Sequence, residues 1–345
     1  MKKFFPKTVI LIFSILFSST IFYVVAQEKS KRGPSGGKGW TRRPTVTQSD
    51  GIDQRVEANQ SAPVASQVSI VAEGDKRVIE SNGIPDHLIG SFPNSGNPHS
   101  VTEQSYRYTI PLNPSPSSSI TPVATNTFGV ALNGVRFHPS AAEFYKGNRQ
   151  SGWRYEALSG AISLGIDESN AHVQPSGSYH YHGLPDLYLE KLGLNPNQHS
   201  PLVGWAADGF PIYAIYGYQD PNDQNSNIIE LKSSYQLKSG RRPSGNDQPG
   251  GSYDGTFVAD YEYVAGVGDL DECNGRYTVT PEYPDSTYAY FLTNSWPVVP
   301  RYFYGEPSKD FLSKGSRSNR SAESSTRENH HHRRDRKHPP NKRKF

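Results

Sequence analysis

Short apolar and aromatic runs, separated by turns rich in Gly, Pro, Asn and Asp, fill the middle of the chain. Their length and their alternation with polar residues are typical of strands. The predicted strands are residues 106–110, 127–132, 179–183, 209–216, 257–264 and 288–292. Residues 186–192 follow a Pro and precede a Gly, which predicts one short helix, and residues 140–145 form a candidate helical turn. The pattern predicts one mainly β domain, sandwich or barrel-like, with one or two short helices.

The two ends of the chain lack this pattern. Lysines precede an apolar run that ends in small residues, so residues 1–26 are predicted to be a cleaved signal peptide, with an N-terminal membrane anchor as the alternative. Residues 27–78 are predicted to be a disordered linker, and residues 309–345 a disordered, basic, His-containing tail. The domain is therefore expected over residues 79–308, in a protein exported to the periplasm, the extracellular space or the cell surface.

Composition and charge restrict the class of protein further. With 34% hydrophobic residues, 31 Gly and 27 Pro, a coiled coil, a helical repeat and a polytopic membrane protein are excluded. Residues 59–313 carry 15 basic and 26 acidic side chains, which argues against a specific nucleic-acid ligand. The tail from residue 314 carries 11 basic and 3 acidic side chains, and is predicted to bind an anionic cell-surface polymer or lipid. The oligomeric state does not follow from the sequence.

A Tyr-His-Tyr-His sequence carries the strongest chemical signal. On a strand, His180 and His182 leave one face, and Tyr179 and Tyr181 leave the other. Two imidazoles placed in this way suit a transition metal, and His172, across a Pro-Ser-Gly turn, is expected as a third ligand. The predicted cofactor is one Cu or Zn ion. The alternative is a structural role, with both imidazoles hydrogen-bonded to the backbone.

Acidic residues, the single cysteine and the two motif tyrosines, Tyr179 and Tyr181, are secondary candidates for the site. Asp208 lies in an apolar run and is expected to bind the metal or to orient an imidazole, with a turn-forming role as the alternative. Asp271, Glu272 and Cys273 are adjacent. Cys273 is either a buried, inert thiol or a soft ligand that would complete a copper site with the two motif histidines.

Seven longer segments occur in order along the predicted domain. They are residues 81–87 (SNGIPDH), 92–100 (FPNSGNPHS), 129–139 (GVALNGVRFHP), 170–185 (NAHVQPSGSYHYHGLP), 202–213 (LVGWAADGFPIY), 253–264 (YDGTFVADYEYV) and 268–276 (GDLDECNGR). With them the chain resembles the YHYH-domain family of exported proteins over residues 79–308. The resemblance implies a site at the Tyr-His-Tyr-His sequence. Relatives carry His where this chain has Ala289, so one histidine of the family is absent here.

Three classes of function remain open at this level. A metal-dependent enzyme, a hydrolase or an oxidoreductase, would use His172, His180 and His182 as ligands and Asp208 or Glu272 as a base. Within the predicted domain, residues 79–308, no Gly-x-Ser-x-Gly nucleophile signature is present. A non-metal binding module would hold a carbohydrate, a peptide or a cell-surface polymer on its Tyr and Trp side chains. A structural role at the cell surface would use the basic tail as an anchor.

Overall fold

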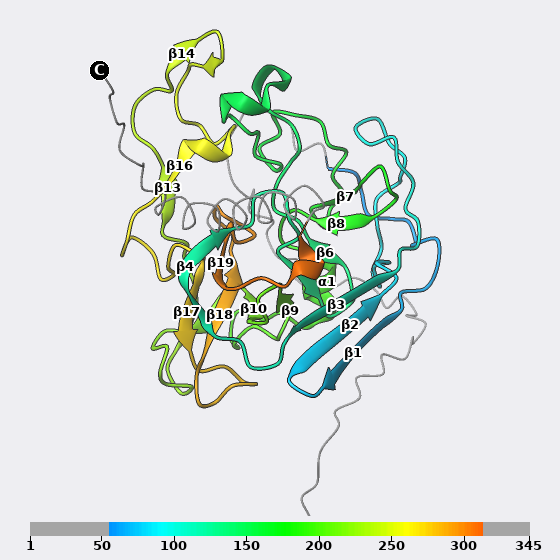
Figure 1. Cartoon of the computed structure of the whole chain (residues 1–345), viewed down its shortest axis with the longest axis vertical. Coiled ribbons are helices and arrows are strands. Elements are labelled where there is room, and N and C mark those ends of the chain that lie inside the picture. The colour runs from blue at the N-terminus through cyan, green and yellow to red at the C-terminus, as the bar shows by residue number, and fades with distance from the viewer. Residues whose placement is uncertain (1–54, 313–345) are drawn as a thin grey trace, which may run out of the picture. The chain divides into compact units, whose positions relative to one another are not determined.

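The structure is a computed structural model that describes residues 55–312, all within one compact unit (Figure 1). The predicted signal peptide, most of the predicted linker and the tail beyond residue 312 lie outside the described residues. The mainly β prediction is confirmed, and α1 (Asp186–Lys191) is the one α-helix of the described part. Within residues 55–312, no helix has the length and apolar character needed to cross a membrane.

An eight-stranded sheet forms the centre of the fold. In spatial order its strands are β17 (Gly275–Thr278), β18 (Thr287–Leu292), β10 (Pro211–Ala214), β9 (Gly204–Ala206), β5 (Gly129–Ala131), β6 (Arg136–Phe137), β8 (Tyr179–Tyr181) and β7 (Ala171–Val173). The pairs β10–β18 and β6–β8 are parallel and the others are antiparallel. The order is open at β17 and at β7, so this sheet is not a closed barrel. The Tyr-His-Tyr-His strand therefore lies near one edge, and the cysteine segment precedes the strand at the other.

A three-stranded sheet packs against this centre. It consists of β1 (Val68–Glu73), β2 (Lys76–Ser81) and β3 (Tyr106–Pro111), which lie side by side in Figure 1. Ile79, Tyr108 and Ile110 are buried in the same hydrophobic cluster as Phe137 and Tyr181 of the large sheet. The linker predicted to reach residue 78 therefore ends earlier, because the half-buried β1 pairs with β2 along its whole length.

Smaller strand pairs and single turns of 3₁₀ helix complete the described residues. The pairs are β4 (Pro116–Pro122) with β19 (Tyr302–Gly305), β11 (Tyr216–Tyr218) with β12 (Ile228–Glu230), β13 (Tyr235–Leu237) with β16 (Tyr261–Tyr263), and β14 (Ser244–Gly245) with β15 (Gln248–Pro249). The 3₁₀ turns are η1 (Tyr145–Gly147), η2 (Arg149–Ser151), η3 (Val258–Asp260) and η4 (Lys309–Phe311). The strand predicted over residues 257–264 is thus a helical turn followed by β16, and the turn predicted over residues 140–145 begins only at Tyr145.

The folded region also continues beyond the predicted boundary at residue 308. Phe311 in η4 is buried and stacks on Tyr108, with ring centroids 4.3 Å apart. An aromatic ring in this position buries a large apolar area and fixes the segment that carries it. Residues 309–312 are therefore part of the domain, and they form one wall of a pocket described below.

Candidate metal centre

A tight hairpin brings the first three histidines together. Strand β7 pairs with β8 so that His172 lies directly opposite His180. The connecting turn is closed by a backbone hydrogen bond from Gly177 to Gln174. Gly177 has a φ of +81°, and a Cβ atom there would lie 1.8 Å from the Thr102 side chain, so the turn requires glycine. The Pro-Ser-Gly turn predicted from the sequence is therefore the element that returns His172 to the motif.

A fourth histidine comes from the neighbouring strand. Strand β6 runs parallel to β8, with Phe137 beside Tyr181, so that His138 follows on the side of His182. The ring centroid of His138 lies 5.4 Å from that of His180 and 6.0 Å from that of His182. Three strands thus direct four imidazoles into one volume. The sequence analysis missed His138, because only the parallel pairing of β6 with β8 brings it to the motif.

The nitrogen atoms of this imidazole group have the spacing of metal ligands. Nε2 of His182 is 3.0 Å from Nε2 of His180 and 3.1 Å from Nε2 of His172. His138, His180 and His182 each offer a nitrogen within 4.8 Å of the others. Zn–N bonds of 2.0–2.1 Å place tetrahedral ligand atoms about 3.3 Å apart. The group could therefore hold a metal ion after only small shifts of its side chains.

Backbone carbonyl groups orient the imidazoles. Three of the four donate an outward N–H to a carbonyl oxygen: His172 Nδ1 to Leu164 at 2.9 Å, His180 Nδ1 to Ser178 at 3.2 Å, and His138 Nε2 to Thr125 at 3.0 Å. A carbonyl can only accept, so the opposite nitrogen of each ring carries a lone pair. For His138 that atom, Nδ1, is buried without a hydrogen-bond partner. A carbonyl on the outer nitrogen is the usual support of a metal-bound histidine.

Burial keeps the imidazoles in their metal-binding form. His180 and His182 are 1% and 2% exposed, and burial lowers the pKa of each well below the ordinary histidine value. Burial also lowers the pKa of His172, and it lowers that of His138 to about 4, with a further contribution from the Arg136 charge. Neutral imidazole is the form that binds metal. At pH 7 a metal would therefore displace no proton from this group.

The comparison with known families agrees with the sequence motifs. The model of the family described as YHYH protein matches residues 107–305, which is more than half of the chain and contains all four histidines. The chain belongs to the YHYH family. No curated protein and no solved structure shows a significant match to it. Membership therefore confirms the resemblance without supplying an activity.

The tyrosines of the YHYH motif lie on the opposite face of β8, as predicted. Tyr179 donates a hydrogen bond to Asp167 at 2.7 Å. The hydroxyl of Tyr181 lies 2.7 Å from His87 Nε2 and accepts from Asn133 Nδ2 at 2.9 Å. Both rings are buried in the core. The two tyrosines of the motif thus pack in the core on one face of β8, and its two histidines meet on the other face.

Asp208 lies elsewhere in the YHYH domain, in the turn between β9 and β10. Its Oδ2 accepts hydrogen bonds from the Tyr290 hydroxyl at 2.5 Å and from the Gly305 amide at 2.9 Å. Burial raises its pKa to about 6. The expectation that Asp208 binds the metal or orients an imidazole is therefore corrected, because its carboxylate serves the turn and β18, while backbone carbonyls orient the histidines.

The cysteine segment lies beside β17, at the far edge of the large sheet. Cys273 is buried, and burial raises the pKa of its thiol. Asp271 accepts hydrogen bonds from Tyr288 at 3.0 Å and from the Cys273 amide at 2.9 Å, and the Glu272 carbonyl accepts from Tyr235. Within residues 55–312 these three residues do not join the imidazole group. The hypothesis of a copper site made by Cys273 and two histidines is therefore wrong.

Ala289, where the resemblance implies a histidine in relatives, is also remote from the imidazole group. Ala289 is fully buried in β18, in a cluster that contains Tyr213, Leu231 and Phe291. Four strands of the sheet separate β18 from β8. A histidine at this position would therefore contact that cluster, and Ala289 in its place leaves the ligands of the imidazole group unchanged.

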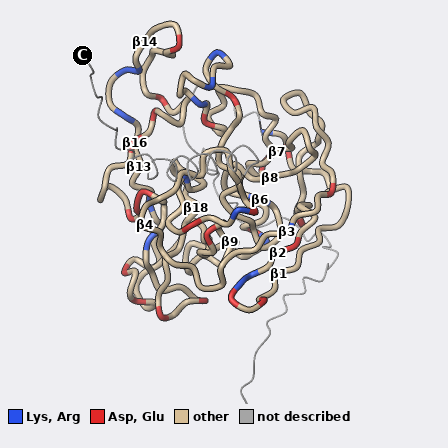
Figure 2. The backbone as a smooth tube through the Cα atoms, viewed as in Figure 1, with Lys and Arg blue, Asp and Glu red and all other residues tan. Residues whose placement is uncertain are grey.

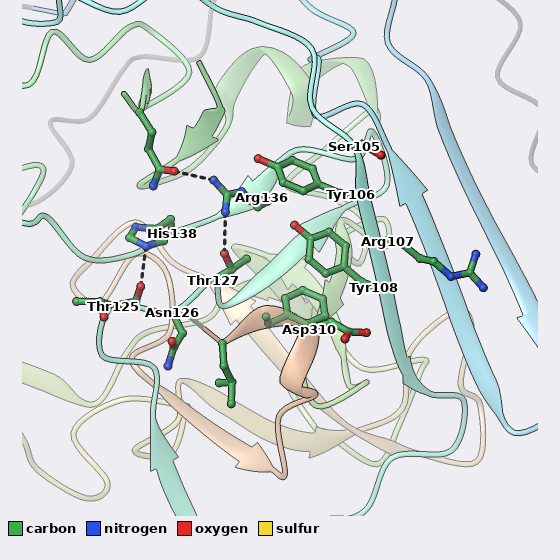
Figure 3. Close-up of a pocket in the computed structure, with 13 residues that line it drawn as sticks. Ser105, Tyr106, Arg107, Tyr108, Thr125, Asn126, Thr127, Arg136, His138 and Asp310 are labelled. Atoms are coloured by element: carbon green, nitrogen blue, oxygen red, sulfur yellow. Dashed lines mark hydrogen bonds between the residues drawn. The ribbon is translucent and has the colours of Figure 1, made fainter. Parts of the chain in front are cut away.

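A pocket of about 400 Å³ adjoins the imidazole group (Figure 3). His138 belongs to both, because its ring lines the pocket and it also offers a nitrogen within 4.8 Å of those of His180 and His182. The other lining residues are Ser105, Tyr106, Arg107, Tyr108, Thr125, Asn126, Thr127, Arg136, Gln174, Asp310, Phe311 and Leu312. The YHYH domain thus places a small-molecule-sized opening beside its histidines.

Proposed function

We propose that this YHYH protein binds one transition-metal ion, Cu or Zn, between His138, His180, His182 and His172. The main support is the spacing of the Nε2 atoms: that of His182 lies 3.0 Å from that of His180 and 3.1 Å from that of His172. Backbone carbonyls also fix the outward N–H groups of His172 and His180. Imidazole nitrogen suits both metals. All four ligands are imidazoles whose pKa is lowered, so the proposed ligand set is electrically neutral. Strands β7 and β8 themselves carry no Lys, Arg, Asp or Glu (Figure 2).

The alternative of an aromatic binding surface has less support. Three tryptophans, Trp153, Trp205 and Trp296, are buried. Among the residues that the structure describes, Tyr277 is the one aromatic side chain among the exposed large hydrophobics. Most of the tyrosines contribute to the core rather than to a ligand-binding face. The pocket beside His138 instead favours a metal centre that a small molecule can approach.

The metal content of the full chain tests this proposal. The tail histidines, His330, His331, His332 and His338, are first replaced by Gln so that they bind no metal. The protein is purified without chelators or metal resin and analysed for its elements. We expect about one equivalent of Cu or Zn per chain. A protein that contains no metal and takes up none on reloading would contradict the proposal.

We also propose that the protein is exported by residues 1–26 and that its basic tail binds an anionic cell-surface polymer or lipid. The support is the sequence itself, with 11 basic and 3 acidic side chains after residue 313. Deleting residues 314–345 is expected to move the protein from the cell-surface fraction to the soluble exported fraction, with an unchanged unfolding midpoint. Unchanged fractionation of the deletion variant would refute the role of the tail.

A further inference from the structure

Arg136 brings an unusual positive charge to the pocket beside His138. Its guanidinium bonds only neutral groups, with Nη2 donating to Gln174 at 2.9 Å and to Ser178 at 2.7 Å. Nη1 has a long contact of 3.4 Å with Thr127, and Nε is buried without a hydrogen-bond partner. No carboxylate within residues 55–312 forms an ion pair with this side chain. A half-buried guanidinium without an acid is unusual, because its charge is normally paired.

The other charged side chains of the pocket do not neutralise Arg136. Arg107 points away from the pocket in Figure 3 and forms ion pairs with Glu80 and Glu73. Asp310, the one acid in the lining, accepts a hydrogen bond from the Thr109 amide at 2.9 Å and forms no ion pair with Arg136. The interior of the pocket therefore keeps an uncompensated positive charge next to the neutral imidazole group.

Aromatic rings form the opposite side of the pocket. Tyr106 and Tyr108 stack with centroids 5.6 Å apart, and Phe311 stacks on Tyr108. The Arg136 guanidinium lies 4.9 Å from the centroid of the Tyr106 ring, so the cation and the aromatic wall are adjacent (Figure 3). Because Tyr106 and Phe311 stack on Tyr108, and Arg136 lies over Tyr106, the wall offers ring edges to a ligand. Ring edges favour a flat ring packed edge to face, and a volume of about 400 Å³ suits a ligand of small-molecule size.

We propose that this pocket binds a small organic carboxylate that carries a ring, with its carboxylate between Arg136 and the imidazole group and its ring against the edges of Tyr106 and Tyr108. Guanidinium and carboxylate form strong charge-assisted hydrogen bonds. The inference rests on the proposed function in one respect, because a divalent ion held by neutral histidines would add attraction for the same anion. Arg136 supplies its charge whether or not a metal is bound.

Benzoate and benzamide test the proposal on the unchanged protein. They share a ring and differ in charge, and their binding to the full chain is measured by calorimetry without metal. We expect benzoate to bind at least about tenfold more tightly, the effect of one charge-assisted contact. Equal binding of the two compounds, or tighter binding of phosphate than of benzoate, would overturn the proposal. Because this pair needs no substitution, a variant that fails to fold cannot obscure the result.

Two arginine variants then locate the contact. Arg136→Gln is expected to remove the preference for benzoate, whereas Arg107→Gln, a matched control on the outer side of the same pocket, is expected to keep it. Arg136→Lys retains the charge and should retain part of the preference. An Arg107→Gln variant that loses the preference while Arg136→Gln keeps it would refute the assignment.

A measurement with metal separates this inference from the proposed function. In Zn-loaded protein, benzoate is expected to bind at least about tenfold more tightly than in metal-free protein, because the ion adds a second attraction. A protein that binds no metal but discriminates benzoate from benzamide would contradict the metal proposal and support the pocket. A protein that binds metal without such discrimination would do the opposite.

Discussion

Replacing both YHYH histidines by glutamine, His180→Gln with His182→Gln, is expected to abolish tight metal binding. Each substitution removes an imidazole nitrogen that lies 3.0 Å from the other, and glutamine keeps a polar side chain of similar size. The loss of a hydrogen-bond partner outside the ligands already costs about 10–100-fold in affinity. Removing two ligands should therefore weaken binding by more than about 1,000-fold, measured by competition with a chelator of known affinity.

His199 provides the matched control for this double variant. It is also a buried histidine, and its ring contacts Tyr213 and Tyr218 instead of the imidazole group. His199→Gln is expected to leave metal affinity unchanged, and both proteins should unfold cooperatively. A double variant that holds metal as tightly as its parent would contradict the site.

The second large effect is a loss of stability in acid. Below pH 6.5 the histidines of the unfolded chain take up protons, whereas His138, with a pKa of about 4, stays mostly neutral at pH 5 in the folded state. His199, whose pKa burial also lowers to about 4, behaves in the same way, as do His180 and His182, whose pKa values lie well below the ordinary value. The unfolded state then binds more protons, so the free energy of unfolding falls as pH falls. Each such histidine lowers the free energy of unfolding by about 2 kcal/mol between pH 6.5 and pH 5.

Two buried carboxylates act in the opposite direction. Burial raises the pKa of Asp167 and of Asp208 to about 6, so the folded state binds their protons first and gains stability as pH falls below 6. At pH 5 each carboxylate offsets about 1.4 kcal/mol of the fall in the free energy of unfolding that the histidines cause. With four such histidines, His138, His180, His182 and His199, against two carboxylates, the free energy of unfolding of the metal-free protein should therefore fall by about 5 kcal/mol between pH 7 and pH 5.

Denaturant titrations in EDTA at the two pH values measure this change. The His180→Gln and His182→Gln double variant should lose most of this pH dependence, because two of the four responsible histidines are gone and the two carboxylates offset most of the rest. A free energy of unfolding that stays constant or rises between pH 7 and pH 5 would show that the carboxylates dominate instead.

Local periodicity was enough to predict the core of the imidazole group. A Tyr-His-Tyr-His sequence can place its histidines on one face only if it is a strand, and the turn glycine at residue 177 returns His172 opposite His180. The mainly β fold follows from the same kind of information, because short aromatic runs between turns pack as strands. The first residues of β1 also alternate, but a half-buried edge strand gives a weak pattern, and the predicted boundary was misplaced there.

Long-range pairing could not be predicted in this way. His138 joins the imidazole group through the parallel pair β6–β8, whose register depends on the whole fold. Asp208 and Cys273 have the chemistry of ligands, yet their strands lie far from β8 in the large sheet. A ligand-like side chain shows only what chemistry is available, and the order of strands decides which side chains meet.

The long connection between β6 and β8 means that the imidazole group joins two points far apart in the sequence. His138 leaves the sheet at the start of a long excursion, and His172 and His180 stand where the chain returns. An ion bound to all of them would cross-link two distant points of the chain, and such closure restricts the unfolded state more strongly as the enclosed loop grows. A chain with a single cysteine cannot form an intramolecular disulfide. The histidines would give it a reversible cross-link instead, one that a chelator or acid opens and a metal ion closes.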